Sequence, residues 1–251
     1  DVKRNLDRRA ERVRVFEVGR VFMRDAAVAA SSQNVQGVAQ PMRLAGAAYG
    51  AASRQGWEGR QSLVDFFDVK GDVEALLGGR DVAFQPVDHP ALHPGRAARV
   101  LLDGRAIGVV GELHPRWRQA WELPRAPVLF ELDLDAVLQG ALPQAQPVPR
   151  QQPVERDIAV VVREAVTHQQ LMAAVHAAPT GGLLRAATLF DIYRPKAGAE
   201  ASAGMAPGDK SLAVRLVLGS EAETLTDERI DGAVTAVIER LQADLGARLR
   251  S

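Results

Sequence analysis

The sequence predicts an α+β protein built from two domains. Strand-like and helix-like segments are interleaved without a regular βαβ period up to about residue 138. A stretch of 139–153 that is rich in proline and glutamine then interrupts the pattern, and the order strand, helix, strand, strand, helix, strand follows it. We therefore place a first domain at residues 1–140, a linker at 141–152 and a second domain at 153–251.

The first domain is predicted to contain a mainly antiparallel sheet. Residues 12–22 are rich in valine and phenylalanine and predict a long strand, and a second strand is expected at 42–50. Two β-rich runs within 99–113 flank Asp103-Gly104, a pair typical of a two-residue type I′ hairpin turn. A short helix is expected after His114-Pro115, and residues 127–138 predict a further strand.

One helix of the first domain is predicted within residues 61–80. Its apolar residues recur at helical spacing. Ser62 is the expected N-cap, with Asp65 three residues later, and Gly78-Gly79 supply a left-handed end.

The second domain is predicted to have the ferredoxin-like βαββαβ order, in which two helices cover one face of a four-stranded sheet. Thr167 and Thr226 are the expected N-caps of the two helices. The predicted strands cover residues 157–162, 183–193, 211–219 and 247–250.

The other face of this sheet is expected to be open, and strand alternation predicts what it carries. We expect Phe190 and Ile192 in the core, and Asp157, Asp191, Tyr193 and Arg215 on the open face. A tyrosine and an arginine among small residues suit single-stranded RNA, which stacks on aromatic or guanidinium planes. An ordinary solvated sheet face explains the same pattern equally well.

Composition limits the kinds of partner. The 31 basic and 31 acidic residues balance, so no overall basic field attracts nucleic acid and any RNA contact must be local. The chain has no cysteine, and no apolar run approaches the roughly 20 residues of a membrane helix. We expect a soluble cytoplasmic protein without membrane contact. Because the chain begins with charged, helix-like sequence and no methionine, we expect a piece of a longer chain.

Three other motifs do not predict chemistry. His89 and His93 are four residues apart, but prolines break any helix between them and no third metal ligand is near. Gly108 and Gly111 do not lead into a helix with a Lys-Ser/Thr pair, so they do not form a phosphate loop. The arginine-rich segment 3–14 is more typical of a solvated helix or a subunit contact than of a nucleic-acid clamp.

Seven motifs occur in a characteristic order along the chain: RVFEVGRVF, DFFDVKGDVEALL, HPGRAARVLLDGRAIGVVGELHP, PVERDIAVVV, TLFDIY, KSLAVRLVL and TLTDERI. In this order and rough spacing they resemble the C-terminal half of the bacterial phenylalanyl-tRNA synthetase beta subunit. The resemblance implies an inactive class II synthetase-like module followed by a ferredoxin-fold anticodon-binding domain that grips the anticodon stem-loop of phenylalanine tRNA. It further implies an (αβ)2 heterotetramer whose alpha subunit uses ATP and Mg²⁺ to activate phenylalanine.

The first module lacks the arginines that a class II active site requires. If Glu17 is aligned with the glutamate of motif 2, Val15 occupies the position of the arginine that holds the ATP α-phosphate, although Arg14 and Arg20 lie nearby. No Gly-x-Gly-x-Gly-x-x-Arg segment follows before the linker. Without these guanidinium groups the transition-state charge has no preorganised partner. We expect no catalytic residue, no metal and no bound cofactor in this chain.

We expect the RNA contacts at one set of side chains on and around the open face. The set comprises Arg156, Asp157, Asp191, Tyr193, Arg194, Lys210, Ser211 and Arg215. The rival hypothesis is a small-molecule-binding regulatory module, because ferredoxin-like domains also form ligand-sensing dimers. An independent class II-like enzyme is disfavoured by the missing arginines.

Overall fold

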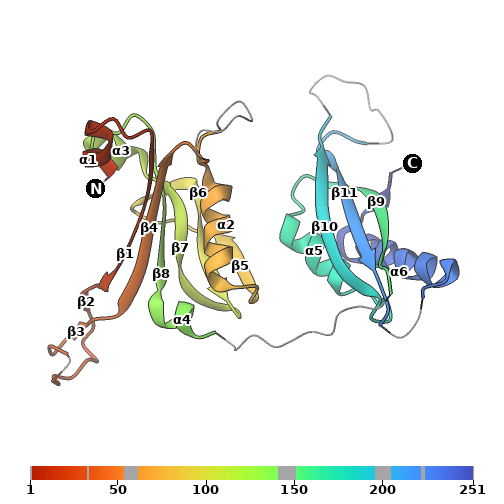
Figure 1. The fold of residues 1–251 in the computed structure, drawn as a ribbon, viewed down its shortest axis with the longest axis horizontal. Coiled ribbons are helices and arrows are strands. Elements are labelled where there is room, and N and C mark those ends of the chain that lie inside the picture. Colours follow the sequence, from red (N-terminus) through yellow and green to blue (C-terminus); the bar gives the residue numbers. More distant parts are fainter. Residues whose placement is uncertain are drawn as a thin grey trace. The chain divides into compact units, whose positions relative to one another are not determined.

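The computed structural model describes residues 2–32, 34–53, 62–140, 151–195, 205–221 and 224–250. The chain divides into two compact units, Asp1–Pro143 and Gln144–Ser251, each with its own sheet (Figure 1). Most of the linker predicted at 141–152 lies outside the described residues. Within the described part, none of the helices combines the length and the apolar character that crossing a membrane requires.

The first unit is built on an antiparallel six-stranded sheet in the order β1-β4-β8-β7-β6-β5 (Figure 1). Its strands are β1 (Arg12–Arg20), β4 (Met42–Gly50), β5 (Val82–Pro86), β6 (Leu92–Leu102), β7 (Arg105–Leu113) and β8 (Val128–Asp133). The smaller elements are α1 (Val2–Asp7), β2 (Met23–Arg24), β3 (Val38–Ala39), α3 (Pro115–Ala120) and α4 (Leu134–Leu138). The mainly antiparallel sheet predicted from the sequence is confirmed.

Helix α2 (Phe66–Leu77) covers one face of this sheet. Its buried residues Val69, Val73 and Leu77 belong to the same apolar core as Val110 and Leu132 of the central strands. These residues lie four positions apart on α2, so one helical stripe meets the sheet. The opposite face of the sheet is therefore not covered by α2.

The ends of α2 correct one prediction and confirm another. The N-cap is Asp65 and not Ser62, because the Asp65 carboxylate accepts from the amides of Phe67 and Asp68, and Asp68 completes a capping box. A carboxylate is the stronger partner for free amides at a helix N-terminus, where the helix dipole favours negative charge. Gly78 and Gly79 have φ of 62° and 76°, as the predicted left-handed end requires.

In the first unit the predicted hairpin turn is confirmed, whereas two strands end earlier than predicted. Asp103 and Gly104 have φ of 50° and 77° between β6 and β7, which confirms the type I′ hairpin. The strand predicted at 127–138 ends at Asp133, because that carboxylate accepts from the Ala136 amide and starts α4. The first strand likewise ends at Arg20, two residues before the predicted end.

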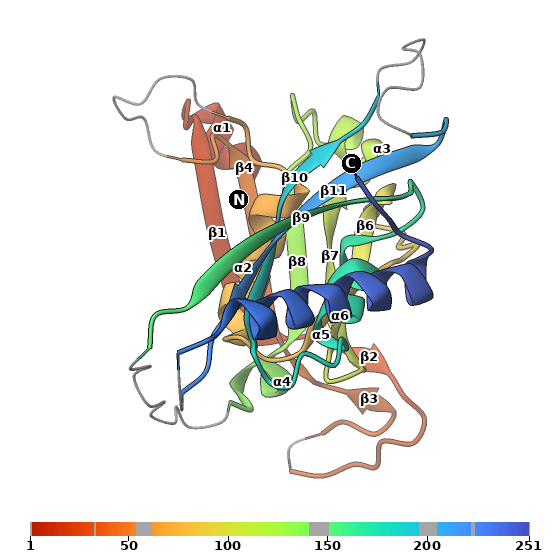
Figure 2. The same cartoon turned by 90° about the vertical axis from the view of Figure 1, so that its right-hand side faces the viewer.

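The second unit has the predicted ferredoxin-like arrangement. Its sheet has the order β10-β11-β9-β12, and all pairs are antiparallel. Figure 2 shows the two helices gathered on one side of the strands. The elements are β9 (Val154–Arg163), α5 (His168–His176), β10 (Leu184–Tyr193), β11 (Asp209–Leu218), α6 (Asp227–Leu245) and β12 (Arg248–Leu249).

The core of the second unit lies between the helices and one face of the sheet. Leu171 of α5 and Val237 and Leu241 of α6 pack with Val160 of β9 and Leu212 of β11, all almost without solvent exposure. Alternate residues of β9 and β11 therefore face the helices, and the residues between them face away. The sheet face that points away from α5 and α6 is therefore the open face.

The two predicted N-caps of these helices are at the predicted positions but differ in chemistry. Thr167 forms a capping box with Gln170, in which each side chain accepts from the backbone amide of the other residue. Thr226 occupies the N-cap of α6 but makes no side-chain capping hydrogen bond. Asp227 and Glu228 in the first turn supply negative charge at this end.

A β-bulge in β10 overturns the prediction that Phe190 lies in the core. The pairing with β11 shifts between Leu189 and Asp191, so Phe190 is an extra residue on the bulged strand. Its side chain is 52% exposed. Ile192 lies opposite Leu212, on the core side as predicted, but it is also exposed because β10 is an edge strand.

Candidate nucleic-acid interface

The open face of the second sheet carries an arginine that is held at a fixed position. Arg215 of β11 lies directly opposite Asp157 of β9, and its Nε and Nη2 donate to the two carboxylate oxygens at 2.9 Å each. Glu155 approaches the same guanidinium at 3.4 Å. The hydrogen bond from Arg215 lowers the pKa of Asp157, and the hydrogen bond to Asp157 raises the pKa of Arg215. A bidentate pair of this kind fixes the plane of the guanidinium.

An aromatic ring lies beside this arginine. The Phe190 ring centroid is 5.4 Å from the guanidinium carbon of Arg215. Because the bulge directs Phe190 outward, the ring and the guanidinium are both available on the same face. A phenylalanine and an arginine side by side form a surface on which a base can stack.

A second arginine–aromatic pair lies further along the strands. Tyr193 of β10 is opposite Ser211 of β11, and Ser211 is opposite Val161 of β9. Arg250 follows β12 at the other edge of the sheet, yet its guanidinium carbon is 5.1 Å from the Tyr193 ring and its Nη1 is 3.4 Å from the Ser211 hydroxyl oxygen. Its side chain therefore reaches across the strands between them.

Small residues separate the two arginine–aromatic pairs. Ala159, Ala213 and Asp191 lie opposite one another on neighbouring strands, in the row between Arg215 and Ser211. Four strand positions separate Arg215 from Ser211, or about 13 Å along the strand. The Asp191 carboxylate is exposed and makes no hydrogen bond or ion pair with any described residue. We call this strip between the two arginine–aromatic pairs the trough. It consists of a row of alanines with, at its β10 edge, a carboxylate that has no partner among the described residues.

The other predicted contact residues lie outside this trough or are already engaged. Arg156 faces the helix side, where its guanidinium is 4.0 Å from Asp227. Arg194 forms a paired contact with Glu164 at 2.9 and 3.1 Å, which lowers the pKa of that carboxyl. Lys210 is 8% exposed and donates to the Glu164 carbonyl oxygen at 2.8 Å, and Ser211 is 3% exposed.

Sequence reasoning missed Phe190, Arg250 and Glu155 on this face. Strict alternation assigns Phe190 to the core, and no feature of the stretch LLRAATLFDIY marks the bulge. Arg250 directly follows the two-residue edge strand β12, whose pairing cannot be read from so short a segment. Glu155 could have been found, since it precedes Asp157 by two residues and therefore shares its face.

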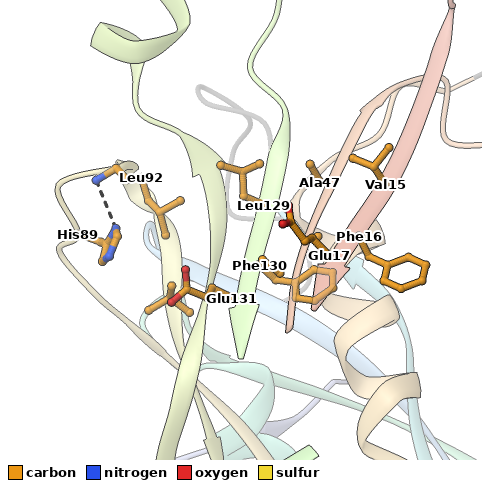
Figure 3. Close-up of a pocket in the computed structure, with 13 residues that line it drawn as sticks. Val15, Phe16, Glu17, Ala47, His89, Leu92, Leu129, Phe130 and Glu131 are labelled. Carbon is orange, nitrogen blue, oxygen red and sulfur yellow. Dashed lines mark hydrogen bonds between the residues drawn. The ribbon is translucent and has the colours of Figure 1, made fainter. Parts of the chain in front are cut away.

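The first sheet carries a concavity of about 340 Å³ on the face that α2 leaves uncovered (Figure 3). Val15 of β1, Ala47 of β4 and Leu129 of β8 form one cross-strand row, and Glu17, Ala45 and Glu131 form the next row. His89 lies at the margin, where its Nδ1 accepts from the Ala91 amide at 3.3 Å. The concavity therefore has an apolar floor and two carboxylates.

The charges of this concavity do not suit a nucleoside triphosphate. No arginine or lysine is among the described residues that line it. Arg14 is directed to the α2 side, where it pairs with Asp72, and Arg20 donates to the Gln40 carbonyl oxygen. Arg43 of β4 lies beside the concavity, but its guanidinium is already paired with Glu131 at 4.0 Å and Asp133 at 3.6 Å. The lining itself supplies carboxylates and no cation to neutralise a triphosphate.

Comparisons with known proteins place both units in one context. Residues 1–134 match the family model "Phenylalanyl tRNA synthetase beta chain CLM domain", and residues 149–250 match "Ferredoxin-fold anticodon binding domain". Similar proteins named phenylalanine–tRNA ligase beta subunit occur in Ralstonia nicotianae and Cupriavidus pinatubonensis. The Ralstonia protein is 51% identical, and the match covers 100% of this chain and 31% of the relative. The Cupriavidus protein is 49% identical, and the match covers 99% of this chain and 31% of the relative. The subunit of Chromobacterium violaceum is 45% identical over 98% of this chain and 29% of the relative. The chain thus spans about a third of the length of these relatives.

Proposed function

The chain belongs to the phenylalanyl-tRNA synthetase beta chain family, and from this premise we propose that it recognises tRNA without catalysing a reaction itself. The second unit binds the anticodon stem-loop of phenylalanine tRNA on its open sheet face. The first unit acts as a scaffold for the alpha subunit of an (αβ)2 ligase in the cytoplasm. ATP and Mg²⁺ are used at that alpha subunit, which performs the aminoacylation.

The observation that carries this proposal is the trough between the two arginine–aromatic pairs. Phe190 and Tyr193 each offer a ring on which an unpaired base can stack, and stacking tolerates the variety of faces that loop bases present. The alanine floor lets a base approach the backbone of β9 and β11. An RNA loop, whose bases are splayed out, matches the trough better than a duplex does.

Each polar group on this face has a distinct proposed role. Asp191 can accept hydrogen bonds from the amino or imino groups of a base, because its carboxylate has no partner among the described residues. Arg215 donates to a base edge or a phosphate through Nη1, which Asp157 does not engage and which exchanges its 3.4 Å contact with Glu155 for the RNA. Ser211 can contribute once Arg250 moves, since the two are 3.4 Å apart.

Arg156, Arg194 and Lys210 remain proposed contacts to the RNA backbone. Each would exchange a carboxylate or carbonyl partner for a phosphate oxygen, so each exchange would cost part of an existing interaction. We therefore assign base recognition to the trough residues and only positioning to these three.

The direct test is a binding comparison with the full chain. A phenylalanine anticodon stem-loop and a stem-loop of the same stem with a scrambled loop are titrated at the same salt concentration, because phosphate contacts depend strongly on salt. The proposal predicts tighter binding of the natural loop. Equal affinity would leave only non-specific electrostatics and would refute recognition of the anticodon. Burial of the open face in a homodimer would instead favour the small-molecule regulatory alternative.

The non-catalytic assignment of the first unit has its own test. We expect no heat of binding when millimolar ATP is titrated into this chain, because no arginine or lysine is among the described residues that line the concavity, and the nearby Arg43 is paired with Glu131 and Asp133. A control variant, Glu17→Gln, removes one of the two charges without adding a guanidinium. Saturable ATP binding by the unmodified chain would contradict the non-catalytic assignment.

A further inference from the structure

A second stacking surface lies on the first unit, at α3. The Arg116 guanidinium carbon is 4.5 Å from the Trp117 ring centroid, and the Trp117 and Trp121 rings are 5.8 Å apart with an interplanar angle of 23°. The three side chains form a column in which a guanidinium and two indoles lie one upon another. We call this column the α3 stack.

The α3 stack is anchored at one end and free at the other. Arg116 Nη2 and Trp117 Nε1 both donate to the Pro90 carbonyl oxygen, at 3.1 and 3.3 Å, which ties the column to the loop before β6. Trp117 is half-buried, whereas Trp121 is 53% exposed. A large aromatic side chain that ends an anchored stack in solvent offers a ready surface for a further planar group.

Unpaired positive charge lies close to Trp121 along the chain, because Arg118 precedes it by three residues and Arg125 follows it by four. Arg118 and Arg125 make no hydrogen bond or ion pair through their side chains with any described residue. Lys3 of α1 is 3.8 Å from Glu122, which brings the basic N-terminal helix to this place. Residues 2–11 and 114–125 together hold seven arginines and lysines against three acids, in a chain whose net charge is zero. Figure 1 shows α1 and α3 at the same end of the six-stranded sheet.

We propose that the α3 stack and the basic residues around it bind an unpaired segment of RNA. A base stacks on the exposed face of Trp121, and Arg118 and Arg125 contact the adjoining phosphates. Excess cations without acid partners favour RNA over a protein partner, because a protein interface of this charge would need a matching acidic surface. The inference rests on the proposed function, in which the second unit binds RNA, but it concerns the first unit and a separate set of residues.

The test uses the full chain and a ten-nucleotide oligoadenylate, which lacks a stem and an anticodon. Trp121→Ala is expected to weaken binding about 5- to 150-fold, the loss of one base stacked on an aromatic ring. Trp121→Phe should retain most of the affinity, since it keeps an aromatic face and guards against a folding defect. Arg118→Ala should weaken binding and reduce the slope of log K against log salt by about 0.7.

A matched control is Arg105→Ala, which removes an unpaired arginine at the far end of β7 from α3 and should leave binding unchanged. Binding that Trp121→Ala and Arg118→Ala leave unaltered would overturn the proposal, as would Trp121-dependent self-association without RNA binding. Anticodon stem-loop binding that survives in the Trp121 variants would show that the proposed function stands by itself. Equal binding of natural and scrambled stem-loops, together with Trp121-dependent oligoadenylate binding, would refute the proposed function and leave the α3 stack proposal standing.

Discussion

Replacing Phe190 by alanine separates base stacking from folding on the open face. The Phe190 side chain is 52% exposed, so roughly half of its area, on the order of 100 Å², is covered by protein. At about 25 cal/mol per Å² this corresponds to at most about 2.5 kcal/mol of stability, which is less than the roughly 5–15 kcal/mol that a domain usually has. The second unit should therefore remain folded.

The same substitution should weaken RNA binding measurably. One base stacked on an aromatic ring contributes about 1–3 kcal/mol, so Phe190→Ala should raise the dissociation constant of the anticodon stem-loop about 5- to 150-fold. The assay is fluorescence anisotropy of a labelled stem-loop at several salt concentrations. Because no phosphate contact is removed, the slope of log K against log salt should not change, whereas Arg215→Ala should reduce it if Arg215 contacts a phosphate.

A matched control exists on the other unit. Phe67 of α2 is 72% exposed, and Phe67→Ala removes a comparable ring away from the open face. Its stem-loop affinity should equal that of the unmodified chain. Unchanged affinity of the Phe190 variant, or an equal loss in the Phe67 variant, would refute the role of Phe190 as a stacking surface.

Three further predictions concern the structure that supports the two surfaces. The Arg215 hydrogen bond lowers the pKa of Asp157, so the ionised carboxylate stabilises the second unit at neutral pH and this contribution is lost as pH falls through the lowered pKa. Melting temperatures of the unmodified chain and Asp157→Asn should differ at pH 6 and converge only as the pH falls below the lowered pKa of Asp157. Gly108→Ala should lower the free energy of unfolding of the first unit, measured in urea, by about 1–3 kcal/mol, because its Cβ would lie 2.0 Å from the Glu131 carbonyl oxygen on β8. Gly71→Ala, on the exposed side of α2, should instead raise that free energy by about 0.5–1 kcal/mol. Asp65→Ala should cost about 1 kcal/mol and Ser62→Ala less than about 0.5 kcal/mol, and the opposite order would restore Ser62 as the cap.

Local signals in the sequence predicted much of the fold. The Asp103-Gly104 turn, the Gly78-Gly79 helix end and the Thr167 cap each depend on neighbouring residues alone, and each was found at its predicted position. The βαββαβ order of the second unit followed from the sequence of such local elements. Family motifs then supplied the proposed function, which no single local pattern carried.

The candidate surfaces depended on contacts that local patterns do not contain. Strict alternation failed at Phe190, because the bulge makes it an extra residue of the strand, whereas Asp191, Ile192 and Tyr193 lie on their predicted sides. Arg250 reaches Tyr193 across strands that come from distant parts of the chain. Lys3 meets Glu122 only because the first sheet brings α1 and α3 to the same end. Each contact is set by tertiary packing and not by neighbouring sequence.

The most direct test of the account asks which face of the second unit meets the anticodon loop. A stem-loop with 4-thiouridine in the loop is photo-crosslinked to the full chain, and the linked peptides are identified by mass spectrometry. The account predicts crosslinks within Leu184–Tyr193 and Asp209–Leu218, at the trough residues of β10 and β11. Crosslinks confined to α5 and α6, which cover the opposite face, would contradict it.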